Sequence, residues 1–146
     1  MNGNEKKDLR MRTKAFALRI IQLYRALPKA AIAQILGRQI LRSGTSVGAQ
    51  YREARRARST AEFVSKMETG LQELEETSYW LELLVDSGIL SANRCANLRK
   101  EADELTAILV SSVRTAKKTR LIGGNSQVLP FLYIHRSSFI IHRFEA

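Results

Sequence analysis

The sequence is poor in the residues that build disulfides, metal sites and tight turns. Its 146 residues include one cysteine, two histidines, two prolines and eight glycines. A single cysteine excludes an intramolecular disulfide, and a reducing, cytoplasmic location is the expectation. So few prolines and glycines favour long helices over a β architecture with many turns.

Long apolar runs are missing as well. No stretch of about 18 consecutive apolar residues occurs, so we expect no transmembrane helix and no membrane partner. The first 14 residues are polar and charged, and they lack the apolar core of a secretory signal peptide. The length is typical of one compact domain with its own core.

The apolar spacing predicts four amphipathic helices, over residues 13–27, 29–57, 59–87 and 91–118. Pro28 ends the first helix, and Ser59 with Glu62 has the spacing of a capping box at the start of the third. Gly88 stands where a helix ends in a left-handed residue. The expected fold class is all-α, an up-down antiparallel four-helix bundle.

The core-facing positions follow from the same spacing. In the third helix a heptad-like stripe comprises Phe63, Met67, Gly70, Leu74, Thr77, Leu81 and Leu84. In the fourth helix the corresponding stripe comprises Leu98, Ala102, Leu105, Leu109, Ser112 and Ala116. The second helix has as inward candidates Ile32, Ile35, Leu36, Ile40, Val47 and Tyr51. We interpret its small residues at 43–48 as a continuous helix that a neighbour approaches closely, with a helix break as the alternative.

The expected domain organisation has three parts. Residues 1–12 form a flexible basic N-terminus, residues 13–118 the bundle, and residues 119–146 a tail. The tail mixes aromatic residues, isoleucines and two histidines without a helical period. Its pattern is compatible with an added strand, an appendage docked on the bundle, or a disordered extension.

Charge is distributed unevenly along the chain, whose net charge is +10. Residues 1–58 hold fourteen lysines and arginines against three acids, a net charge of +11. Residues 59–90 hold one lysine against seven acids, a net charge of −6. A strongly basic segment attracts polyanions such as nucleic acid.

The candidate nucleic-acid-binding residues are arginines of the second helix and its end. They are Arg38, Arg42, Arg52, Arg55, Arg56 and Arg58. Guanidinium groups suit phosphate oxygens, and such contacts give affinity without reading the base sequence. Tyr51 lies beside them, but one aromatic side chain does not make a stacking platform, and we expect it to pack within the bundle.

An alternative hypothesis uses the same charges for self-assembly. Opposite faces on one molecule favour head-to-tail contacts between copies, so the protein would be a structural protein–protein adaptor. The candidate interface residues are Glu73, Glu76, Tyr79 and Trp80. The two aromatic side chains fill either the core or a pocket between subunits.

Motifs for catalysis, metals or cofactors are absent from the sequence. Both histidines, His135 and His142, lie in the tail, and no Glu-x-x-His motif of a di-metal bundle occurs. No Gly-Lys-Ser/Thr follows the glycines of the second helix, and Cys95 has no helical histidine to activate it. We therefore expect no enzyme activity, no metal and no cofactor.

Three segments resemble a known bacterial family. The stretch from Gln39 to Ala54, the pair Glu62-Phe63 and the segment from Leu74 to Leu84 are similar to the "four-helix bundle protein" family, which is encoded within intervening sequences of 23S ribosomal RNA genes. The family is similar to the accessory variability determinant of diversity-generating retroelements. The resemblance covers residues 13–118 and not the tail. Gln50 stands where many relatives carry asparagine, a change that leaves the expected fold intact.

The resemblance implies more than the residues do. It implies a homo-oligomer, specifically a homopentameric ring, with a basic surface suited to RNA or DNA and no established enzymatic activity. In the retroelement relatives the ring works with a reverse transcriptase and its template RNA. The combined expectation is a non-enzymatic bundle that binds nucleic acid as the accessory of a nucleic-acid enzyme or of an rRNA intervening sequence.

Overall fold

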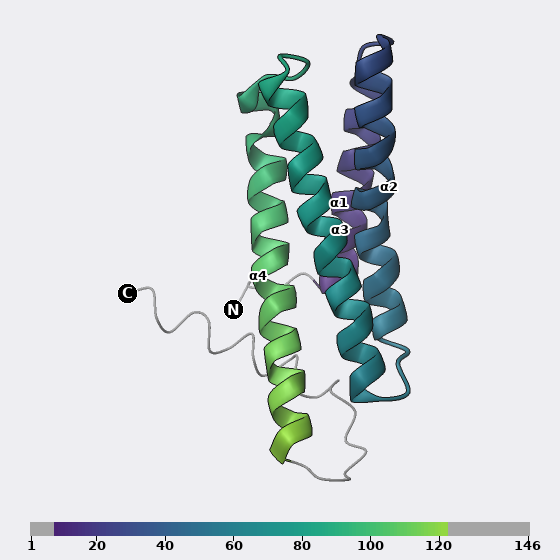
Figure 1. The fold of residues 1–146 in the computed structure, drawn as a ribbon, viewed down its shortest axis with the longest axis vertical. Coiled ribbons are helices and arrows are strands. Elements are labelled where there is room, and N and C mark those ends of the chain that lie inside the picture. The colour runs from purple at the N-terminus through teal and green to yellow at the C-terminus, as the bar shows by residue number, and fades with distance from the viewer. Residues whose placement is uncertain (1–7, 123–146) are drawn as a thin grey trace, which may run out of the picture.

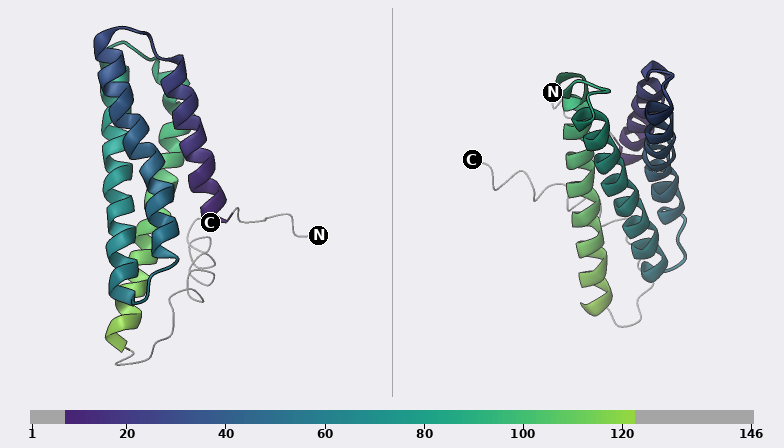
Figure 2. Two further views of the ribbon diagram at one scale, coloured as in Figure 1. Left: turned by 90° about the vertical axis from the view of Figure 1, so that its right-hand side faces the viewer. Right: turned by 45° about the horizontal axis from the view of Figure 1, so that its top comes forward.

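The computed structural model describes residues 8–122, and these form four α-helices without a β-strand among them. Helix α1 spans Leu9–Ala26, α2 spans Ala31–Ala54, α3 spans Thr60–Asp86 and α4 spans Ala92–Ile122. The helices run up and down in two layers, α1 with α2 and α3 with α4 (Figures 1 and 2). This confirms the predicted all-α four-helix bundle. No helix in this part of the chain is long and apolar enough to cross a membrane.

The helix ends are set by local capping. The Ser59 hydroxyl accepts a hydrogen bond from the Glu62 amide at 3.1 Å, as the capping spacing predicts. The Glu62 carboxylate reaches back one residue further than the standard box and accepts from the Arg58 amide. Gly88 ends the α3 region with φ +75°, the left-handed conformation that favours glycine. Helix α1 begins four residues earlier than predicted, because Asp8 caps it.

The stripes predicted for α3 and α4 form most of the core. All seven α3 positions and all six α4 positions are buried. They pack against Phe16 and Ile20 of α1 and Ile40 and Val47 of α2, each fully buried. Between α2 and α3 the Thr77 and Ser43 hydroxyls lie 2.8 Å apart inside this core, a hydrogen bond that satisfies two buried polar groups.

The small residues of α2 serve close packing, and the helix is continuous through residues 43–48. At Gly44 a β-carbon would lie 2.7 Å from Ile20 Cγ1, which is closer than real atoms approach. Helix α1 therefore comes near enough to α2 to fill the space that a side chain would occupy. The alternative of a break in this region is wrong.

The prediction that Ile32 and Ile35 face the core is wrong. Their exposed fractions are 64% and 58%. The buried line of α2 runs instead through Ala33, Gly37 and Ile40, where small side chains admit α1. The two isoleucines lie about 100° or more around the helix from that line.

Helices α1 and α4 meet along the least packed seam of the bundle. Arg12 spans it, donating to Glu101 at 2.9 Å and to Glu104 at 2.8 Å. Its hydrogen bonds with Glu101 raise the pKa of the Arg12 guanidinium. Ion pairs also cross the α2–α3 and α3–α4 seams, at Arg42 and Lys117, so the α1–α4 seam differs in being less closely packed.

The predicted N-terminal segment and the predicted tail each lie partly outside the described residues. Residues 1–7 belong to the expected flexible N-terminus, whereas residues 9–12 are helical. Residues 123–146 make up most of the expected tail, and residues 119–122 are the last turn of α4. Both histidines fall outside the described part as well.

Candidate nucleic-acid interface

The six predicted arginines do not form one continuous site. Arg38 and Arg42 lie in the middle of α2, while the others lie at its C-terminal end or in the turn to α3. Arg38 and Arg52 are fourteen positions apart, which corresponds to about 21 Å along the helix axis. The structure therefore separates two arginines from the remaining four.

Arg42 is engaged within its own chain. Its guanidinium lies 3.1 Å from the Glu73 carboxylate and also contacts Glu76. This clasp joins α2 to α3 across the outside of the bundle, and both acids were candidates for an intersubunit interface. An exposed pair of this kind contributes about 0–1 kcal/mol, but it neutralises the local charge.

Arg55 is also partly engaged, because its guanidinium lies 3.7 Å from the Asp8 carboxylate. It lies beside Tyr51, whose exposed fraction is 4%. Burial raises the pKa of the Tyr51 hydroxyl, and the nearby Arg55 charge opposes that rise. Tyr51 is thus a core residue, as predicted, and offers no ring to a nucleic-acid base.

Exposed cations converge where α1 begins, α2 ends and α4 ends. Antiparallel packing brings these three termini to one end of the bundle, as the Asp8–Arg55 contact and the Lys117–Glu68 ion pair at 2.7 Å show. We call this group the basic end, and it comprises Arg10, Arg52, Arg56, Arg58, Arg114, Lys118 and Arg120. All seven side chains are exposed. Within residues 8–122 none of them forms an ion pair.

The α4 members of the basic end were missed by sequence reasoning. Arg114 and Lys118 are more than fifty residues from Arg58 in the chain, and the prediction took its candidates only from the second helix and its end. The signal that could have found them is topological. In an up-down bundle the second and fourth helices end on the same side, so two basic C-termini add to one surface.

The candidate interface residues fall into two environments. Glu73 and Glu76 belong to the Arg42 clasp. Tyr79 is 52% exposed, whereas Trp80 is half-buried and packs against the core. The two rings lie 5.0 Å apart between centroids, tilted by 54°. The structure thus divides the adjacent aromatic residues between surface and core.

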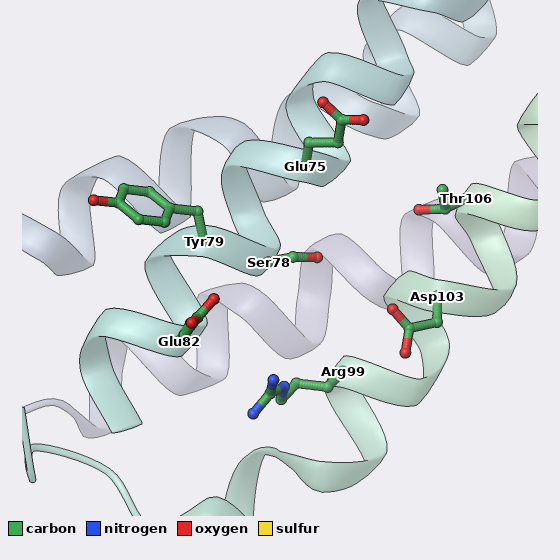
Figure 3. A pocket seen from close by; sticks show the side chains of 7 residues that line it. All are labelled: Glu75, Ser78, Tyr79, Glu82, Arg99, Asp103 and Thr106. Carbon is green, nitrogen blue, oxygen red and sulfur yellow. The ribbon is translucent and has the colours of Figure 1, made fainter. Parts of the chain in front are cut away.

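A groove of about 360 Å³ lies between α3 and α4. Glu75, Ser78, Tyr79 and Glu82 line it from α3, and Arg99, Asp103 and Thr106 line it from α4 (Figure 3). Three of these seven side chains are acidic. A surface of this sign repels phosphate, so the groove and the basic end are suited to different partners.

No metal centre is evident among residues 8–122. No three side chains of histidine, cysteine, aspartate or glutamate gather there in a way that could hold a metal ion. Cys95 is fully buried, and desolvation raises the pKa of its thiol.

The buried Cys95 thiol should react slowly with a disulfide reagent in the native protein. The thiolate is the reactive form, and both burial and the raised pKa suppress it. Following the release of the reagent's chromophore at neutral pH should show one slow thiol, which becomes fast in denaturant. Equal rates in both conditions would contradict the buried position.

Comparisons with known proteins define the class of protein. Residues 5–111 match the 23S rRNA-intervening sequence proteins, so this chain belongs to the 23S rRNA-intervening sequence protein family. A similar solved structure is a protein of unknown function from the S23 ribosomal protein family of Bacteroides thetaiotaomicron. It shares 36% sequence identity and a TM-score of 0.70, covering 73% of this chain and 96% of that one. No curated protein sequence matched.

Proposed function

We propose that this protein binds RNA or DNA through the basic end, without catalysing a reaction. The observation that carries the proposal is the gathering of seven exposed cations from three helix termini, none in an ion pair within residues 8–122. Cations that lack internal partners keep their positive potential available to phosphate groups. Arg38 adds a separate exposed cation on α2.

The kind of recognition follows from the side chains present. Arginine and lysine contact phosphate oxygens irrespective of base, and Tyr51, the aromatic residue next to Arg52, is buried and cannot stack on a base. Binding should therefore depend steeply on salt and weakly on sequence. The family name points to transcripts of 23S rRNA genes as one source of ligand, and the retroelement resemblance points to a reverse transcriptase as a partner.

Self-assembly belongs to the same proposal. The resemblance to ring-forming relatives implies a homo-oligomer, with a pentamer as the expected form. A ring would repeat the basic end around its axis and multiply the phosphate contacts, which raises affinity without new chemistry.

The test removes three cations from the basic end. Changing Arg52, Arg56 and Arg58 to glutamine should weaken binding of single- and double-stranded RNA and DNA oligonucleotides by about tenfold or more at low salt. The slope of log affinity against log salt should become shallower by about 0.9 for each duplex-DNA phosphate contact removed. Fluorescence anisotropy across a salt series measures both quantities.

A matched variant separates a local surface from general attraction. Lys29, Arg94 and Lys100 are exposed cations away from the basic end, and changing them to glutamine removes the same charge. This control should retain most of the affinity. Equal losses in the two variants, or no binding by the unmodified protein, would contradict the proposal. Loss of the oligomer with unchanged nucleic-acid binding in the first variant would favour the adaptor function.

A further inference from the structure

The acidic charge of α3 divides into a neutralised part and an unpartnered part. Glu68, Glu73 and Glu76 form ion pairs with cations of the same chain. Glu75, Glu82 and Asp86 form none within residues 8–122, and all three are exposed. Arg99 of α4 lines the same groove as Glu75 and Glu82 but forms no ion pair with them, so these exposed acids are available to a cation from elsewhere.

These acids form a stripe on the outside of α3 together with Tyr79. Positions 75, 79, 82 and 86 repeat at steps of four, three and four, which places them on one face of the helix. We call them the α3 stripe. Figure 3 shows Glu75 and Glu82 above and below Tyr79, whose ring projects outward at the α3 edge of the groove. An exposed aromatic ring flanked by carboxylates suits the apolar stem and cationic head of lysine or arginine.

Helix α1 carries a stripe of complementary character on its own outer face. Met11, Lys14, Leu18 and Arg25 are spaced by three, four and seven residues, so they share one face. We call them the α1 stripe. Met11 is 65% exposed and Leu18 is 49% exposed, and both cations are exposed. Neither cation forms an ion pair within the described residues.

We propose that the α1 stripe of one copy docks on the α3 stripe of a second copy. Each stripe combines large exposed apolar groups with unpartnered charge, and the two signs are opposite. The α1 stripe carries two cations and the α3 stripe carries three acids, none of them in an ion pair within residues 8–122. Contact between the stripes would remove apolar surface from water and match the charges.

The placement of the stripes makes the contact intermolecular. Helices α1 and α3 belong to different layers of the bundle (Figure 2), and each stripe faces outward, so one copy cannot join its own two stripes. A head-to-tail contact leaves one stripe free on each end copy, and such assembly continues until a ring closes, whereas a twofold dimer uses both stripes of both copies at once. The mass of the assembly distinguishes the two arrangements. The basic end takes part in neither stripe and stays available, so this inference does not depend on nucleic-acid binding.

The test exchanges the charges of the two stripes. Changing Glu75 and Glu82 to lysine, or Lys14 and Arg25 to glutamate, should each raise the dissociation constant of the assembly by about tenfold or more. Combining all four changes in one chain should restore assembly, because the charges then match again with reversed sign. Size-exclusion chromatography with light scattering gives the mass, and sedimentation velocity gives the dissociation constant.

Two further variants sharpen the result. Tyr79→Ala should weaken assembly without changing any charge, because it removes the apolar centre of the α3 stripe. Lys29→Glu with Lys100→Glu reverses two exposed charges outside both stripes and should leave assembly intact. Circular dichroism melting of every variant checks that the bundle is folded.

Three outcomes would overturn the inference. The unmodified protein could be monomeric at every concentration tested, or either charge reversal could leave the assembly unchanged. The four-fold variant could also fail to reassemble although both two-fold variants dissociate and all are folded. In that last case the two stripes contact other surfaces of the neighbouring copy rather than each other.

Discussion

Replacing Gly44 by valine should destabilise the bundle by about 4 kcal/mol or more, a large part of the stability of a domain this size. A β-carbon at this position would lie 2.7 Å from Ile20 Cγ1 and 3.2 Å from Ile20 Cβ, and valine adds two methyl groups beyond it. Ile20 is fully buried and branched near its backbone, so it cannot swing away. Helix α1 must then separate from α2. Chemical denaturation followed by circular dichroism measures the loss.

A neighbouring glycine provides the matched control. At Gly48 a β-carbon would lie 3.4 Å from the Thr13 hydroxyl oxygen, an ordinary contact distance. Gly48→Ala should therefore be neutral or stabilising by up to about 1 kcal/mol through helix propensity. Coupling to Ile20 gives a second check, since Ile20→Ala should lessen the cost of Gly44→Val. Strictly additive effects of these two changes would contradict the close contact.

Leu109→Ala should destabilise the protein by about 3 kcal/mol. Its side chain is 1% exposed and packs over Gly70 of α3, where a β-carbon would lie 3.4 Å from Leu109 Cδ2. Truncation leaves a cavity at the centre of the α3–α4 seam, and the cavity adds to the lost burial of apolar surface. Equilibrium denaturation of the two proteins gives the difference in the free energy of unfolding.

A second change at Gly70 tests whether that cavity is where the structure places it. Gly70→Ala alone should be neutral or stabilising by up to about 1 kcal/mol through helix propensity, because its β-carbon would meet Leu109 Cδ2 at 3.4 Å, an ordinary contact distance. In the Leu109→Ala background the added methyl group also fills part of the cavity, so the same change should stabilise by more than it does in the unmodified protein. A recovery no larger than in the unmodified protein would argue against the contact.

The sequence was sufficient for the fold where large side chains occupy the core. In α3 the stripe from Phe63 to Leu84 was predicted in full, because its apolar residues alternate with polar ones at regular steps. In α2 the same reasoning placed Ile32 and Ile35 inside, and they are exposed. The error has a physical origin. Where two helices approach closely, the core positions are occupied by glycine and alanine. A search for large apolar residues overlooks these positions.

The positions of the charged side chains relative to one another depend on how the helices pack, which the residue pattern of a single helix does not show. The register of α2 against α3 decides that Arg42 meets Glu73 and Glu76 rather than solvent. The topology decides that Arg114 and Lys118 join Arg56 at one end of the bundle. Net charge by segment indicated a basic half correctly, but the pairing of individual charges depends on three-dimensional neighbours.

The ion pairs of Arg12 with Glu101 and Glu104 lie across the weakest packing contact between neighbouring helices in the bundle. Helix α2 packs closely against α1 and α3, and α3 packs closely against α2 and α4. Helices α1 and α4 each have one closely packed neighbour and contact each other less. Across their shared seam Arg12 pairs with Glu101 and Glu104, and mobile ions in the surroundings weaken these ion pairs while leaving apolar contacts strong. Local opening of the bundle should therefore begin with the separation of α1 from α4, and added salt should make this opening more frequent.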